Sequence, residues 1–212
     1  MSVRVAAICG LLAPLTYTAA LFLGSLAQPD AFSSADDAIS DLGADTASSP
    51  WIYNQVGLNL TGIFMMLFAL GLWRALSPGL LGRLGAVAVA LTGLTLVLQG
   101  FFRLDCQDID PACENTSWHS EAHRLATGAS AVFFIAAPIV LALAFRRLPS
   151  WRDSWLPSLA AIPAFFVMSI VFSGIGDGAS TRAGAITWFV WLGFVAFRLL
   201  QKADHGGVRT EV

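Results

Sequence analysis

Charged residues are scarce in this sequence, and lysine is almost absent. Only 12% of the 212 residues are Asp, Glu, Lys or Arg, whereas a soluble domain carries about 25%. Lys202 is the only lysine, no run of basic residues is present, and the formal net charge is -2. Binding to nucleic acid would require clustered Lys or Arg to neutralise phosphates. The composition therefore argues against a nucleic-acid partner and against an ordinary soluble domain.

Apolar residues take the place of the missing charge. They make up 56% of the chain, and the mean hydropathy is +0.69. A helix that crosses a bilayer needs about 20 mostly apolar residues, and six stretches meet this requirement without an internal repeat or a linker between them. The sequence predicts one all-α integral membrane domain over residues 1–212, a six-helix bundle with a tail at 203–212. The predicted helices are 5–27, 51–76, 79–103, 120–146, 154–176 and 181–200.

The basic residues predict the orientation of the bundle. Nine of the twelve lie at one set of alternate helix ends, and only Arg103, Arg124 and Arg182 lie at the other. Loops rich in Lys and Arg stay on the cytoplasmic side. We therefore expect a multi-pass protein of the cell inner (plasma) membrane with both termini in the cytoplasm. Eleven of the fourteen acidic residues would then face outward.

The first apolar stretch has a second interpretation, as a signal peptide. Arg4 gives it a basic start, and the small residues at 25–27 resemble a cleavage site. Signal peptides have apolar regions of about 7–15 residues, and this stretch is longer. The length favours an uncleaved helix.

Polar side chains crowd the outer half of the predicted bundle, while the inner half has no matching set. Such residues can hydrogen-bond helices to one another, but polar groups inside a membrane also line cavities and functional sites. The asymmetry leads to the hypothesis of an outward-facing polar pocket. Its candidate ligand-binding residues are Asn54, Asn59, Gln99, Asp177 and Arg182.

Two histidines at the start of the fourth predicted helix form a candidate metal site. His119 and His123 are four residues apart and would share a helix face. With Asp105, Asp41 or Asp177 as a third ligand, they would resemble a zinc or iron site. The spacing does not match the His-Glu-x-x-His motif of metalloproteases. The alternative is that both histidines hydrogen-bond at the level of the lipid headgroups.

The sequence of each of the two long outer loops predicts a local structure. Cys106 and Cys113 would form a disulfide in an oxidising compartment, or remain free thiols. In the first loop, Ser34 and Asp37 have the spacing of a capping box, and Gly43 can end a helix. We expect a short interfacial helix there, with a solvated acidic loop as the alternative.

Several short motifs resemble a known family. They are Ile39–Gly43 with Asp41 inside it, Tyr53-Asn54 followed by Gly62, Gly100–Asp105, His123, and Gly174 with Arg182. In these segments the chain resembles bacterial and archaeal membrane proteins of domain of unknown function family 998. Arg103 in place of proline, Tyr53 in place of phenylalanine, and the additional His119 depart from that family's pattern. The resemblance implies a six-helix fold whose motif residues lie in the outer polar layer, and it implies no activity.

The sequence supports two functions. One is a binding, sensory or transport-accessory protein that interacts with membrane lipids and holds a small polar ligand or lipid headgroup in the pocket. The other is an intramembrane hydrolase or transferase acting on a lipid, in which His123 would work with Asp105 or Asp41 as an acid/base pair, or as metal ligands. A secondary transporter fits less well, because no inverted repeat is evident. We further expect Asp105, His123 and Arg182 to form one cluster, with Asp41 or Asp177 as a further partner.

Overall fold

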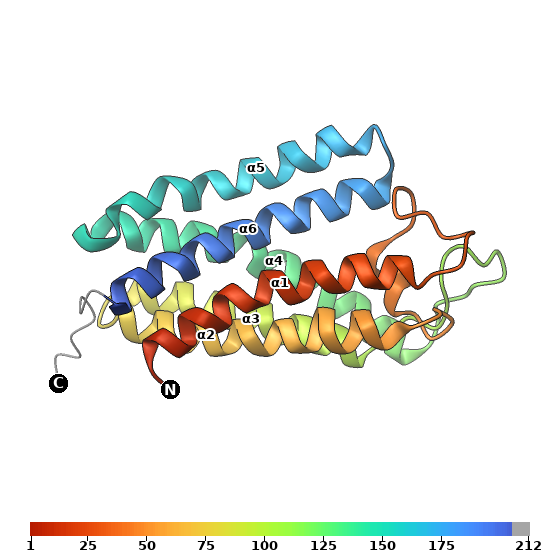
Figure 1. Ribbon diagram of the computed structural model, residues 1–212, viewed down its shortest axis with the longest axis horizontal. Coiled ribbons are helices and arrows are strands. Elements are labelled where there is room, and N and C mark those ends of the chain that lie inside the picture. The colour runs from red at the N-terminus through yellow and green to blue at the C-terminus, as the bar shows by residue number, and fades with distance from the viewer. Residues whose placement is uncertain (205–212) are drawn as a thin grey trace.

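The computed structural model describes residues 1–204, and this part of the chain is helical without strands. Six helices are long and apolar enough to cross a membrane (Figure 1). The fold class predicted from hydropathy is therefore confirmed. From residue 205 onward, the predicted tail lies outside the described residues. The helices are α1 (Val3–Leu26), α2 (Thr61–Ala75) preceded by a π-helix at Ile52–Leu60, α3 (Leu80–Phe101), α4 (Trp118–Arg147), α5 (Trp155–Ser173) preceded by a 3-10 helix at Pro149–Ser154, and α6 (Asp177–Asp204).

Helix α6 differs most from its predicted bounds. It begins at Asp177 rather than at residue 181 and continues to Asp204. An acidic residue in the first turn is stabilised by the positive end of the helix dipole, so Asp177 favours the earlier start. The other spans begin and end within a few residues of the predicted positions, when the π-helix is counted as the start of the second span.

Close helix packing holds the bundle together. Helix α3 lies between α2 and α4, and α1 lies against α2 and α6. At the crossing of α2 and α3, a Cβ added to Gly62 would stand 2.3 Å from the Gly93 carbonyl oxygen, and one added to Gly93 would stand 2.6 Å from the Gly62 carbonyl oxygen. Only glycine allows two backbones this near to each other, which is a common way of packing membrane helices.

The two ends of the bundle are built differently. The N-terminus and the last turn of α6 lie at one end, which we call the terminal end, together with the short connections after α2 and α4 (Figure 1). The opposite end, which we call the loop end, carries the long connections 27–51 and 102–117 and the tight turn 174–176. All the side chains proposed from the sequence as ligand-binding or catalytic residues belong to segments at or near the loop end.

The first long loop does not contain the helix expected from Ser34. Residues 34–36 form a turn, residue 37 forms a bend, and a five-residue 3-10 helix follows at Ile39–Gly43. The reciprocal hydrogen bonds involve the preceding serine, because the Asp36 N–H donates to Ser33 Oγ at 3.2 Å and the Ser33 N–H donates to Asp37 Oδ2 at 2.6 Å. The loop folds against the bundle, and Asp41 is fully buried.

Candidate functional site

The two long loops are joined into one structure, which we call the loop cap (residues 27–51 and 102–117). The Asp45 N–H donates to the Leu104 carbonyl at 2.9 Å, and the Asp45 carboxylate pairs with Arg103 at 2.9 Å. Gln107 is buried and extends the connection, since its Nε2 donates to Gln28 Oε1 at 3.0 Å and to the Asp41 carbonyl at 3.1 Å. These contacts fix both loops over the same end of the bundle.

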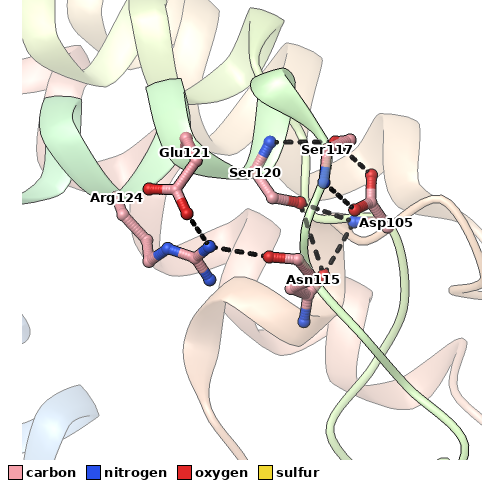
Figure 2. A network of polar contacts seen from close by, with 6 residues as sticks. All are labelled: Asp105, Asn115, Ser117, Ser120, Glu121 and Arg124. Carbon is pink, nitrogen blue, oxygen red and sulfur yellow. Dashed lines mark hydrogen bonds and ion pairs between the residues drawn. The ribbon is translucent and has the colours of Figure 1, made fainter.

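A disulfide closes the tip of the second loop, as predicted. Cys106 and Cys113 are bonded, with their Cα atoms 5.6 Å apart. Asn115 lies beside the bridge, and its Oδ1 accepts the N–H groups of Asp105 at 2.8 Å and Cys106 at 3.2 Å. Figure 2 shows Asn115 at the centre of the polar network where this loop meets α4.

Asp105 anchors the start of α4. Its carboxylate accepts hydrogen bonds from the Ser117 hydroxyl and, at 2.9 Å, from the Ser117 N–H (Figure 2). Ser117 is the N-cap of α4, and its Oγ accepts the Ser120 N–H at 3.2 Å. The two hydrogen bonds from Ser117 hold the pKa of Asp105 below its ordinary value. Both carboxylate oxygens are therefore used in local structure.

His123 is held in a defined orientation by the end of α3. Its Nδ1 lies 2.7 Å from the Phe102 carbonyl oxygen and 3.3 Å from that of Gln99. A carbonyl can only accept, so Nδ1 carries the hydrogen, and in the neutral ring Nε2 has the free lone pair. The side chain is only 6% exposed.

The histidine pair does not assemble a metal site. His119 packs against the edge of Trp118, with ring centroids 4.3 Å apart, while His123 faces the end of α3. Among residues 1–204, no three His, Cys, Asp or Glu side chains come together in a way that could hold a metal ion. The carboxylate of Asp105, the third ligand considered for zinc, is hydrogen-bonded to Ser117 instead.

The two asparagines proposed as ligand-binding residues have structural partners. Asn54 is buried, and its Nδ2 donates to the Gly43 carbonyl at 2.8 Å. Asn59 Nδ2 donates to Gln55 Oε1 at 2.8 Å. Gly43 packs closely against the Asn54 side chain, since an added Cβ would stand 2.3 Å from Asn54 Oδ1. Asn54 therefore fastens the first loop to the start of the second spanning segment.

Arg182 fastens the same loop to α6. One guanidinium nitrogen, NH1, donates to the Asp37 carbonyl at 2.8 Å, and the guanidinium lies 5.8 Å from the centre of the Phe32 ring. The N–H of Ala179 adds a bond of 2.7 Å to the Ala35 carbonyl. The remaining nitrogens of Arg182, Nε and NH2, are buried and have no hydrogen-bond partner in the described part of the chain.

Asp41 lies at the junction of the two loops. Its Oδ2 accepts the Asp108 N–H at 3.2 Å, while its Oδ1 is buried without a partner among residues 1–204. Burial, together with the nearby negative charge of Asp108, raises the pKa of Asp41 to about 6. This carboxyl therefore takes up a proton at a higher pH than an ordinary aspartate does.

A cavity of about 670 Å³ lies beneath the loop cap. Side chains from α1, the π-helix, α3, α4, α6 and both loops line it. Of the residues proposed from the sequence, Gln99, His123 and Asp177 belong to the lining, whereas the others do not. Those outside the lining are Asp41, Asn54, Asn59, Asp105, His119 and Arg182.

The expected cluster of Asp105, His123 and Arg182 does not form. Asp105 bonds to Ser117, His123 bonds to the end of α3, and Arg182 bonds to the first loop. No hydrogen bond or ion pair joins any two of the three within the described range. Each side chain instead satisfies backbone groups near it.

The family model described as "Protein of unknown function (DUF998)" matches residues 11–198. The chain belongs to this family. No curated protein and no solved structure matches this chain.

In this DUF998 protein, most of the motif residues hold the loop cap in place. Asp41, Asn54, Asp105 and Arg182 each bond to backbone groups of the cap or of the start of α4. His123 differs from the others, since it also lines the cavity. The family pattern therefore coincides with the construction of the loop end.

Sequence reasoning missed the tyrosines of the cavity. Tyr17 and Tyr53 line it, and they are 6% and 5% exposed. Their phenolic groups lie within electrostatic range of each other and of the Arg182 guanidinium. The signal available was that the chain's only two tyrosines both fall in the outer half of predicted spans.

Proposed function

We propose that this protein binds a small polar ligand or a lipid headgroup in the cavity beneath the loop cap, as a binding, sensory or transport-accessory protein of the membrane. The observation that carries the proposal is the cavity itself. Its volume of about 670 Å³ falls within the range of about 300–1,000 Å³ that is usual for small-molecule sites.

The character of the cavity wall supports ligand binding. His123 and Gln99 are 6% and 8% exposed, and both line the cavity. Polar side chains are costly inside a membrane protein and tend to mark ligand or ion sites there. The loop cap is also tied down by many hydrogen bonds, so the cavity is largely preformed. A preformed site loses less conformational entropy when a ligand binds.

The enzymatic alternative, a lipid-acting hydrolase or transferase, receives less support. A histidine acid/base usually needs a carboxylate or similar group within hydrogen-bond reach to orient it. His123 is oriented by carbonyl groups, and the carboxylate of Asp105 is used by Ser117. Asp41 accepts a bond from the Asp108 N–H. The described residues offer a single oriented imidazole, which fits recognition of a ligand better than the paired chemistry expected for hydrolysis.

The proposal also includes an orientation. The chain is a multi-pass membrane protein, and we place both termini in the cytoplasm, with the cavity open to the outside of the cell inner membrane. The nine-to-three distribution of basic residues supports this orientation. A cavity on the outer side would sample ligands from the outer leaflet or the external medium.

The proposal can be tested by filling the cavity. Ala38 lines it from the first loop, so Ala38→Trp should occupy part of its volume. Ala31 lies in the same loop, is exposed and is not part of the lining, so Ala31→Trp is the matched control. Native mass spectrometry of protein extracted gently from its own membrane should show a bound small molecule or lipid on the wild type and on Ala31→Trp, and much less on Ala38→Trp. Equal retention by both variants, or a bare wild type, would contradict the proposal.

A further inference from the structure

We infer that the cavity beneath the loop cap recognises a protonated amine, because its buried floor presents free hydrogen-bond acceptors while its rim carries unpaired carboxylates. The inference rests on the proposed function and names the ligand class of the same site. A free small amine and a lipid headgroup that ends in an amine share this chemistry.

The floor of the cavity presents acceptors. His123 Nδ1 is held by the Phe102 carbonyl, which leaves Nε2 as an acceptor. Gln99 Nε2 donates to the Thr95 carbonyl at 3.2 Å, which fixes the amide orientation and leaves Oε1 as an acceptor. Neither free atom has a partner within residues 1–204, although both side chains are more than nine-tenths buried. A ligand that satisfies them must bring N–H or O–H groups.

Two aromatic rings add to the preference for a cation. Tyr17 and Tyr53 line the cavity and are almost fully buried. The face of a tyrosine ring attracts a cation, and its hydroxyl can accept a hydrogen bond from an ammonium group. Both tyrosines therefore offer groups that suit a cation, although Phe189 stacks on one face of the Tyr17 ring, with ring centroids 4.2 Å apart.

The rim of the cavity carries negative charge. Asp36, Asp37, Asp108 and Asp177 line it, and the carboxylates of Asp108 and Asp177 have no hydrogen bond or ion pair in the described chain. Carboxylates at the mouth of a cleft raise the local concentration of cations. Unlike the buried acceptors, they select by charge alone. Together the two features require a ligand that is both cationic and a hydrogen-bond donor.

The nearby cations do not reverse the charge of the rim. Arg124 lines the cavity, but its NH2 group donates to Glu121 at 2.6 Å and to the Asn115 carbonyl at 2.7 Å (Figure 2). Arg182 is outside the lining and donates to the Asp37 carbonyl. Four carboxylates therefore face two guanidinium groups, and one of these is already ion-paired.

The first experiment compares four probes on the purified full-length protein in detergent, by calorimetry or ligand-dependent thermal stability. Ethanolamine supplies charge and hydrogen-bond donors, tetramethylammonium supplies the charge without any donor, ethylene glycol supplies donors without charge, and acetate supplies the opposite charge. Ethanolamine should bind at least ten-fold more tightly than the other three. Equal or tighter binding of acetate or ethylene glycol would overturn the inference. Equal binding of tetramethylammonium would also overturn it, because the buried acceptors would then have no role.

A second experiment removes negative charge from the rim of the cavity. Asp108→Asn combined with Asp177→Asn should weaken ethanolamine binding at least ten-fold, and both positions are exposed, so the fold should persist. Asp30→Asn combined with Asp110→Asn makes the same charge change in the loop cap outside the lining and should weaken binding less than two-fold. Equal losses in the two double variants would contradict a specific site.

A third experiment separates the two sources of the amine. Nanodiscs of phosphatidylethanolamine and of phosphatidylglycerol are compared by native mass spectrometry. Retention of phosphatidylethanolamine that excess ethanolamine displaces indicates a headgroup ligand, whereas tight binding of ethanolamine without lipid retention indicates a free amine. A bound ligand without an amine would overturn the inference and leave the proposed function intact. A wild-type protein that retains no ligand of any kind would overturn both.

Discussion

The terminal end and the loop end of the bundle differ in how deeply their ionisable groups are buried. At the terminal end, Arg4 and Asp204 pair at 3.4 Å with both side chains well exposed, and Arg83 lies over the Trp73 ring at 5.3 Å. At the loop end, Asp41 is fully buried and His123 nearly so. Exposed ion pairs contribute about 0–1 kcal/mol each, whereas a buried polar group destabilises the fold unless it is hydrogen-bonded. The loop end is therefore the region where single changes should have large effects.

The comparison also explains why the sequence motifs gather at one end. The terminal end needs only short connections and interfacial Arg, Lys and Trp, and many residues can supply these. The loop end has to hold two long loops over a cavity, and each loop depends on particular donors and acceptors such as Asn54 and Asp105. The ligand site that we propose would account for an end built with so many buried polar groups.

The largest expected difference concerns two glycines. In Gly43→Ala, the added Cβ would stand 2.3 Å from Asn54 Oδ1 and displace the Asn54 bond that holds the first loop. Overpacking and a broken buried hydrogen bond should together cost about 2–3 kcal/mol. Gly79→Ala at the terminal end brings the Cβ within 3.3 Å of the Leu76 carbonyl oxygen, and it should cost under about 1 kcal/mol. Denaturant unfolding of both variants checks this, and equal losses would remove the contrast between the ends.

A smaller effect should appear as a pH dependence of the loop cap. The pKa of Asp41 is raised to about 6 in the folded protein, above its value of about 3.9 in an unfolded chain. The folded state therefore binds this proton more tightly, and the associated stability is present below about pH 4 and lost as the pH rises through about 6. Between pH 5 and pH 7.5 the loss should be on the order of 1–2 kcal/mol.

Limited proteolysis of the cap measures this effect. The wild-type cap should be cut more slowly at pH 5 than at pH 7.5, after correction for protease activity. Asp41→Asn should resist cutting equally at both values, because it carries no proton to lose. An unchanged pH slope in Asp41→Asn would assign the dependence to another group.

The smallest effect is expected for an ion pair at the terminal end. Arg4→Gln removes the exposed pair with Asp204 and should change the free energy of unfolding by less than about 1 kcal/mol, with a further decrease in high salt. Salt titration of the unfolding midpoint of the wild type and the variant provides the measurement. A loss as large as that of Gly43→Ala would show that the two ends do not differ in the way described.

Hydropathy was sufficient to predict the six helices, because each spanning helix must contain about 20 apolar residues whatever its partners are. The disulfide was also predictable from two cysteines in one loop. The roles of Asp105 and Arg182 were not predictable in the same way. The sequence suggests Asp105 as a catalytic or metal-binding residue and Arg182 as a ligand-binding residue. Their partners are Ser117 and the Asp37 carbonyl, and the Arg182 contact joins residues 145 positions apart that only the folded topology brings together. Tyr17 was overlooked because a tyrosine within an apolar run resembles an ordinary core residue.

The central claim is that the loop end holds an open cavity, which we propose faces the outside of the cell, and two positions on α4 test it most directly. Thr127 lines the cavity, whereas Leu125 is 74% exposed in the absence of lipid and should face the bilayer. The two residues differ little in depth and point to opposite sides of the helix. In intact cells, a membrane-impermeant thiol reagent should label Thr127→Cys and leave Leu125→Cys unlabelled, and the buried Cys9 should stay unreactive. Labelling of Thr127→Cys only after permeabilisation would reverse the orientation, and failure to label it under both conditions would contradict the cavity.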